Sequence, residues 1–96
     1  MLTQWADGFF CAAHRGADGI LHGHTWRVRA YWDYAGTDIL ARQAKLKEAL
    51  SYLDHRELPS GLSRAEDIAA DLGRGLFCLR VDVWREHEGL GASWTA

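Results

Sequence analysis

Apolar and polar residues alternate most regularly between residues 22 and 34. One face of this segment carries His22, His24, Trp26, Val28, Ala30, Trp32 and Tyr34, and the other carries Arg27, Arg29 and Asp33. Because the side chains of a β-strand point alternately to opposite faces, this period of two predicts a half-buried strand.

Three other segments are expected to be strands. Residues 3–14 contain a run of apolar positions, and residues 15–21, with two glycines, connect them to 22–34 as a hairpin. Residues 78–87 alternate again, and a short strand at about 91–96 can pair with them. The faces of the 78–87 strand are predicted to be Leu79, Val81 and Val83 on one side and Arg80, Asp82, Trp84 and Glu86 on the other.

Between these strands the apolar period changes to that of helices. Residues 38–53 place Ile39, Leu46, Leu50 and Leu53 on one stripe, and Thr37 or Asp38 can cap the start of this helix. Residues 55–61, with the only proline, are expected to be a loop. The pattern Ser63-x-x-Glu66 is typical of a capping box that opens a second helix, and Gly73 and Gly75 are expected to end it.

The order of elements is therefore β-β-α-α-β-β, which predicts an α+β fold. We expect a four-stranded antiparallel sheet with two helices on one face. The chain has 96 residues, which is the length of one domain, so residues 1–96 are interpreted as a single domain.

Charge and composition argue against several classes of function. The net charge is −2 and the basic residues are scattered, so we expect neither nucleic acid nor a membrane surface as a partner. The chain has no apolar run of about 18 residues and no signal-peptide pattern, which predicts a cytoplasmic protein. Cys11 and Cys78 are isolated, and in a reducing compartment we interpret both as buried apolar residues.

The most specific chemical signal is the spacing of His14, His22 and His24. Residues two apart on a strand share a face, so His22 and His24 can reach one ion, and the hairpin would bring His14 alongside. Three imidazoles leave the fourth position of a tetrahedral Zn²⁺ open, which is typical of a catalytic site. Iron, nickel or copper would also accept these ligands, and each histidine taken alone could instead be a surface or core residue.

Several short motifs together resemble the 6-pyruvoyltetrahydropterin synthase and 6-carboxytetrahydropterin synthase family. They are Phe10-Cys11-Ala12-Ala13-His14, Leu21-His22-Gly23-His24, Leu53-Asp54-His55 and a glutamate near the C-terminus, Glu86. The resemblance implies the tunnelling fold, in which three subunits close a barrel, and a homohexamer built as a dimer of trimers. It also implies zinc on His14, His22 and His24, proton transfer by Asp54 and His55, and Glu86 as the anchor of a pterin ring.

One departure from the family concerns its catalytic cysteine, four residues before the first histidine of the His-Gly-His motif. That position is Asp18 here, and Cys11 would face away from His14 on a strand. A carboxylate can still move a proton if burial raises its pKa. Family members with a glutamate near this position imply retro-aldol cleavage of the 7,8-dihydroneopterin side chain. The alternative is that Asp18-Gly19 is simply a turn.

The other candidate residues also have structural alternatives. Asp54 and His55 suit an oriented general base, but a histidine there could instead complement the dipole at the end of a helix. Glu86 suits the two adjacent N–H donors of a pterin edge, but it could be a surface strand residue, and Glu88 is its neighbour in register.

The expected function is a zinc-dependent lyase acting on 7,8-dihydroneopterin, its triphosphate or a related pterin side chain. The alternative is a catalytically altered family member that binds a pterin or purine, or that acts on a different purine-derived substrate.

Overall fold

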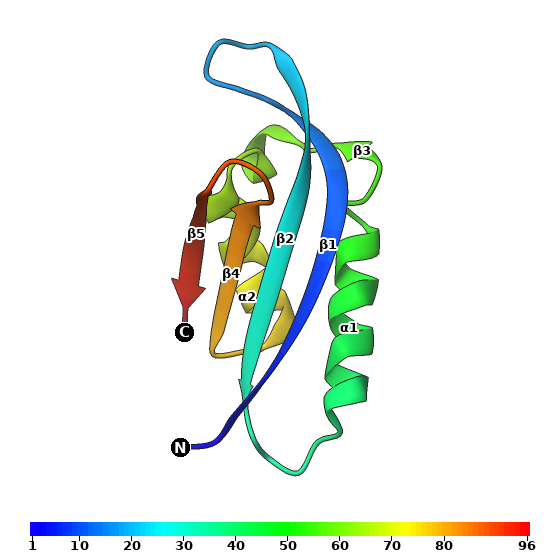
Figure 1. The fold of residues 1–96 in the computed structure, drawn as a ribbon, viewed down its shortest axis with the longest axis vertical. Coiled ribbons are helices and arrows are strands. Elements are labelled where there is room, and N and C mark those ends of the chain that lie inside the picture. The colour runs from blue at the N-terminus through cyan, green and yellow to red at the C-terminus, as the bar shows by residue number, and fades with distance from the viewer.

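The computed structural model describes residues 1–96, which form one mixed β-sheet and two α-helices (Figure 1). The elements run in the order β1 (Thr3–Arg15), β2 (Leu21–Asp33), α1 (Ile39–Ser51), β3 (Arg56–Glu57), the short 3₁₀ helix η1 (Ser60–Leu62), α2 (Ala65–Leu76), β4 (Arg80–Arg85) and β5 (Leu90–Thr95). The strands are ordered β3-β1-β2-β4-β5 across the sheet. The predicted α+β class, with its two helices, is confirmed.

The long hairpin of β1 and β2 forms the centre of the sheet, and its register sets which side chains of the two strands face each other. The two strands pair antiparallel over their full length, so that His14 lies opposite His22 and Ala12 opposite His24. The alternation seen in the sequence is the alternation of burial along β2, where Trp26, Val28 and the following even-numbered residues are buried. Both predicted strands are therefore present, within one residue of their expected limits.

The sheet has five strands and is mixed, so the expected four-stranded antiparallel sheet is wrong. The extra strand, β3, pairs parallel with β1 within the segment expected to be a loop. The His55 N–H donates to the Cys11 carbonyl at 2.6 Å, and the Leu58 N–H donates to the Ala13 carbonyl at 2.8 Å. A two-residue strand of charged side chains carries no periodicity, which is why the sequence pattern does not reveal it.

The hydrophobic core lies between one face of the sheet and the two helices. Helix α1 packs on β1, and α2 packs on β4 and β5. Phe10 and Trp26 are fully buried on the sheet side and stack with ring centroids 6.0 Å apart. They share one apolar cluster with Leu46 of α1 and Ile68 of α2, so both helices cover the same face.

The ends of the helices agree only partly with the sequence prediction. Asp38 caps α1 as expected, since its carboxylate accepts from the Leu40 N–H. The predicted capping box of α2 is wrong: the N-cap residue is Arg64 and makes no side-chain cap bond, while the Ser63 hydroxyl donates to the Ser60 carbonyl.

The prediction that Gly73 and Gly75 end α2 is wrong. The helix continues through Leu76, and Phe77 adopts the left-handed conformation at φ 52° instead. Gly73 has a packing role, because a Cβ atom there would collide with the indole ring of Trp94. Close helix–strand packing, rather than a helix end, explains this glycine.

The tip of the β1–β2 hairpin projects beyond both helices (Figure 1). The molecule measures 45 × 23 × 21 Å, with the hairpin along its long axis in this view. The sheet is open, with β3 at one edge and β5 at the other, so the barrel closure expected from an oligomer is not part of the single chain. Neither helix has the length and apolar content needed to cross a membrane.

Candidate functional site

The three histidines of the hairpin lie on the helix-side face of the sheet, at the end that projects past the helices. They occupy even-numbered positions, like Phe10 and Trp26 in the core, so strand alternation alone sets their direction. His14 is buried, with 4% of its surface exposed. The side chain of His24 is 15% exposed and that of His22 is 43% exposed, so His22 is the most accessible of the three.

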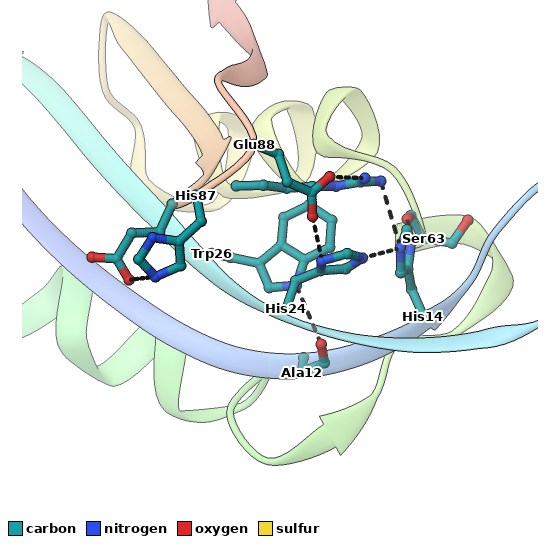
Figure 2. Close-up of polar contacts among 9 residues, drawn as sticks. Ala12, His14, His24, Trp26, Ser63, His87 and Glu88 are labelled. Carbon is teal, nitrogen blue, oxygen red and sulfur yellow. Dashed lines mark hydrogen bonds and ion pairs between the residues drawn. The ribbon is translucent and has the colours of Figure 1, made fainter.

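His14 and His24 point their Nε2 atoms at each other (Figure 2). The Nδ1–H of His14 donates to the Ser63 carbonyl at 2.6 Å, and the Nδ1–H of His24 donates to the Glu88 carboxylate at 2.8 Å. In its neutral form, a ring anchored in this way carries its lone pair on Nε2, and the two Nε2 atoms lie 2.9 Å apart. Metal-binding histidines are usually anchored in this way through the other ring nitrogen.

The surroundings of His24 also favour the neutral ring. Burial lowers the pKa of His24, and the positive charge of Arg85 lowers it further. Since a metal binds only the unprotonated imidazole, both effects favour the ligating form.

His22 lies apart from this pair. Its ring centroid is 6.1 Å from that of His14 and 6.2 Å from that of His24, and its Nε2 lies 3.6 Å from the Asp18 carboxylate. The structure contains no group of three His, Cys, Asp or Glu side chains already arranged around one point.

The donor chemistry of the two buried histidines nevertheless fits a zinc ion. Tetrahedral zinc with Zn–N bonds of 2.0–2.1 Å separates two nitrogens by about 3.3 Å. The 2.9 Å gap between the Nε2 atoms of His14 and His24 would have to open by only a few tenths of an ångström. His22 would have to turn from Asp18 to complete a set of three.

Asp18 lies in the tight turn at the hairpin tip. Its carboxylate accepts from the Ile20 N–H at 2.9 Å, and Gly19 follows with φ 77°. This bond from the Ile20 N–H lowers the pKa of Asp18, and the nearby His22 lowers it further. Asp18 is exposed and its pKa is lowered overall, which is opposite to the shift that proton donation needs, and its hydrogen bond to the Ile20 N–H is that of a turn.

Asp54 and His55 form a hydrogen-bonded pair beside strand β1. One oxygen of Asp54 accepts from the Cys11 N–H at 2.9 Å, and the other lies 2.8 Å from Nδ1 of His55. The Cys11 N–H bond, followed by the His55 bond, lowers the pKa of Asp54, so this carboxylate is ionised near neutral pH. It therefore holds the Nδ1–H of His55 and directs Nε2 outward from a side chain that is 82% exposed.

His55 does not lie in the last turn of a helix. Helix α1 ends at Ser51, and His55 has φ 57°, a left-handed conformation that turns the chain into β3. The helix-dipole explanation of this histidine therefore does not apply.

Glu86 is placed on the sheet face opposite the helices, immediately after β4. One of its carboxylate oxygens accepts from the Nε and Nη2 of Arg27 at 2.9 and 2.6 Å, and the other lies 3.6 Å from His87. Its carboxylate is thus half engaged already, and one oxygen remains for another donor.

Two adjoining cavities connect these groups. The first, of about 640 Å³, is lined by Cys11, Ala12, Ala13, Gly23, His24, Thr25, His55, Arg56, Arg85, Glu86, His87 and Glu88. The second, of about 590 Å³, is lined by His14, Gly16, Ala17, Asp18, His22, His24, Arg85 and Glu88. His24, Arg85 and Glu88 line both cavities, so the cavity of the histidine cluster and the cavity that reaches His55 meet at these three residues.

Two of these three shared residues, Glu88 and Arg85, make contacts that the sequence did not suggest. Glu88, considered only as a neighbour of Glu86, bonds both His24 and Arg85. Arg85 follows Val81 and Val83 on the helix-side face, and a charged residue at that position of the alternation is the signal that marks it.

Known proteins resemble this chain in structure but not closely in sequence. The chain resembles the solved structure of Caenorhabditis elegans 6-pyruvoyl tetrahydropterin synthase with a TM-score of 0.72. The similarity covers 99% of this chain and 95% of that one, at 16% sequence identity. No protein-family model matches the chain, and no curated protein sequence matches it. The similarity therefore shows a shared fold.

Proposed function

We propose that the protein is a zinc-dependent lyase acting on the side chain of 7,8-dihydroneopterin, its triphosphate or a related pterin. The observation that carries this proposal is that His24, Arg85 and Glu88 line both the cavity of the histidine cluster and the cavity that reaches His55. Similarity in fold to a 6-pyruvoyl tetrahydropterin synthase over nearly the whole chain supports the substrate class.

The metal would be held by His14, His24 and His22. The first two already direct their Nε2 atoms to one place, and His22 would join them by leaving Asp18. Zinc, when bound, would act as a Lewis acid that polarises the hydroxyl oxygens of the pterin side chain.

His55 would act as the general base, held by Asp54. Its Nδ1–H bond to Asp54 leaves Nε2 free to accept the proton of a side-chain hydroxyl. In a retro-aldol cleavage, that hydroxyl becomes the carbonyl of the departing fragment as the adjacent C–C bond breaks. The electron pair of that bond takes a proton on the carbon next to the ring, so His55 can return the proton it removed.

Glu86 and Asp18 have secondary roles in this proposal. Glu86 would accept two N–H donors from the pterin edge, which requires Arg27 to release the oxygen that it binds. Asp18, with its lowered pKa, would be available near neutral pH only as a carboxylate, so any proton transfer by it would begin with acceptance.

The assembly and location follow the same proposal. The open edges at β3 and β5 are consistent with closure of a barrel by three subunits, and a dimer of two such rings would give a homohexamer. A cytoplasmic location is part of this proposal.

Mass spectrometry of the reaction products tests the function. The zinc-loaded protein would be incubated separately with 7,8-dihydroneopterin and with its triphosphate, beside the variant His55→Ala. We expect a 6-substituted pterin product from the unaltered protein and none from His55→Ala, which should still bind zinc. Normal turnover by His55→Ala would overturn the assignment of the base.

The same experiment also identifies the alternative function. If neither compound is converted but both bind, and Glu86→Ala abolishes that binding, the chain is a pterin-binding member of the fold rather than a lyase.

A further inference from the structure

We propose that Arg85 serves as the internal cation of the metal-free His14–His24 pair, so that zinc must displace its guanidinium in order to bind. This inference rests on the metal site of the proposed function. It assigns to Arg85 the control of how tightly that site holds a metal.

Both rings of the pair are held through their Nδ1 atoms. Both Nδ1–H groups are already used, one by the Ser63 carbonyl and one by Glu88 (Figure 2). The two Nε2 atoms lie 2.9 Å apart and face each other, so a cation held by both rings would sit between them.

Arg85 places a positive charge beside this pair. Its Nη2 lies 3.5 Å from Nε2 of His14, and its Nη1 donates to Glu88 at 2.9 Å. Glu88 therefore contacts both His24 and Arg85, which connects the guanidinium to each ring of the pair. The guanidinium also lies over the ring of Trp26, 5.4 Å from its centroid, and Trp26 meets both imidazoles edge-on.

The guanidinium is only partly satisfied in this position. Its Nε is buried and has no hydrogen-bond partner. An unpaired buried donor is costly, so the position is stabilised mainly by charge and by the Trp26 face. A divalent cation placed between the two Nε2 atoms would repel the guanidinium at close range.

The displaced Arg85 side chain has a cavity to move into. Arg85 lines the 640 Å³ cavity as well as the cavity of the histidines, so a turn of its side chain would move the charge toward the space beside His55. Glu88 would then be left with His24, which is the carboxylate–histidine arrangement that supports a bound metal. Zinc binding would therefore present a positive charge to the substrate cavity.

Zinc affinity of charge-neutral variants tests this inference. Arg85→Met keeps the length of the side chain and its contact with Trp26 but removes the charge. Arg80→Met is the matched control, because Arg80 lies on the same strand, over the ring of Tyr31 at 5.2 Å, and pairs with Asp82 at 2.8 Å. His14→Ala reports whether the histidine site is the one measured.

We expect competition with a zinc chelator to show about ten- to hundredfold tighter binding by Arg85→Met and no change for Arg80→Met, a range typical of coupling between two sites. Unchanged affinity in Arg85→Met, together with loss of binding in His14→Ala, would overturn the role of Arg85 and leave the metal site standing. Equal zinc binding by the unaltered protein and His14→Ala would instead refute the metal site and this inference with it.

A second measurement needs no variant of Arg85. The Nε–H signals of the arginines can be followed by ¹⁵N NMR during a zinc titration of the unaltered protein. Arg85 Nε–H should shift and exchange faster with solvent as zinc binds, while Arg80 Nε–H stays in place. An Arg85 signal that does not respond at saturating zinc would overturn the displacement.

Discussion

Two neighbouring register pairs on one face of the sheet have opposite characters. Val28 and Val83 face each other beneath the helices and are fully buried. Two residues further along the same strands, Trp26 faces Arg85, and beyond them the strand carries His24. The strands, the face and the pairing pattern are the same, and Trp26, itself fully buried, lies at the boundary where the apolar part of this face ends.

This comparison explains where chemistry can occur in so small a domain. Below α1 and α2 the face must be apolar, because no water reaches it and no polar partner is provided. Where the helices stop, backbone and side-chain acceptors such as the Ser63 carbonyl and Glu88 take their place. These acceptors can hold the imidazoles in one tautomer, and a ligand can still reach the rings.

The largest expected effect comes from breaking the covered half. Phe10→Ala should destabilise the protein by about 3–5 kcal/mol, because it removes a fully buried ring stacked on Trp26. Phe9 is its neighbour on the opposite face and is 59% exposed, so Phe9→Ala should cost far less. Urea unfolding of both variants measures the difference, and equal losses would contradict the assignment of faces.

A smaller effect tests how closely α2 approaches β5. Gly73→Ala should destabilise by about 1–3 kcal/mol, because its methyl group would collide with Trp94 and overpack the contact. Gly75 lies in the same helix with open space at its Cβ position, so Gly75→Ala should stabilise by about 0.5–1 kcal/mol through helix propensity. Thermal unfolding distinguishes the two, and a stabilising Gly73→Ala would refute the close contact.

The contribution of the exposed Asp54–His55 pair to the free energy of unfolding should depend on pH. The bond from the Cys11 N–H, and then that from His55, lower the pKa of Asp54 below that of the unfolded chain, about 3.9. The stabilisation is therefore complete above that value and is lost as pH falls through the folded pKa. Urea midpoints of the unaltered protein and Asp54→Asn should differ near neutral pH and converge in acid. A gap that stays constant down to low pH would show that the carboxylate charge is not involved.

The smallest effect is expected on the face opposite the helices. Asp7 and Arg29 form a two-point ion pair there, with Oδ1 bonded to Nε and Oδ2 to Nη2, but both side chains are partly exposed. Asp7→Ala should therefore cost only about 0.2–1 kcal/mol, and less in high salt. Chemical denaturation at low and high salt measures this, and a loss as large as that of Phe10→Ala would place this pair in the core.

Elements with a repeating pattern of apolar residues could be predicted from the sequence. Features that depend on a single contact could not. The alternation along 22–34 gave the long strand and its buried face, since each residue adds to the same period. Strand β3 has two residues and depends on bonds to the Cys11 and Ala13 carbonyls, which no local pattern reveals. The end of α2 at Phe77 was likewise missed, because a left-handed phenylalanine has no strong sequence signal.

The candidate site shows the same division. Strand alternation predicts that His14, His22 and His24 share a face, and the register places His14 opposite His22. The anchoring of His14 by Ser63 joins residues 49 positions apart, and the contact of Arg85 with His14 joins residues 71 apart. Such contacts arise only when the chain is folded, so they could not be read from spacing.

X-ray absorption of zinc bound to the unaltered protein tests the central claim most directly. The claim is that the uncovered end of the sheet binds zinc through three imidazoles, with His22 leaving Asp18 to join His14 and His24. We expect about three nitrogen ligands at about 2.0–2.1 Å with imidazole scattering. One imidazole should be lost in His22→Ala and none in His87→Ala, whose side chain is 85% exposed. A spectrum unchanged by His22→Ala, or zinc without imidazole ligands, would contradict the account.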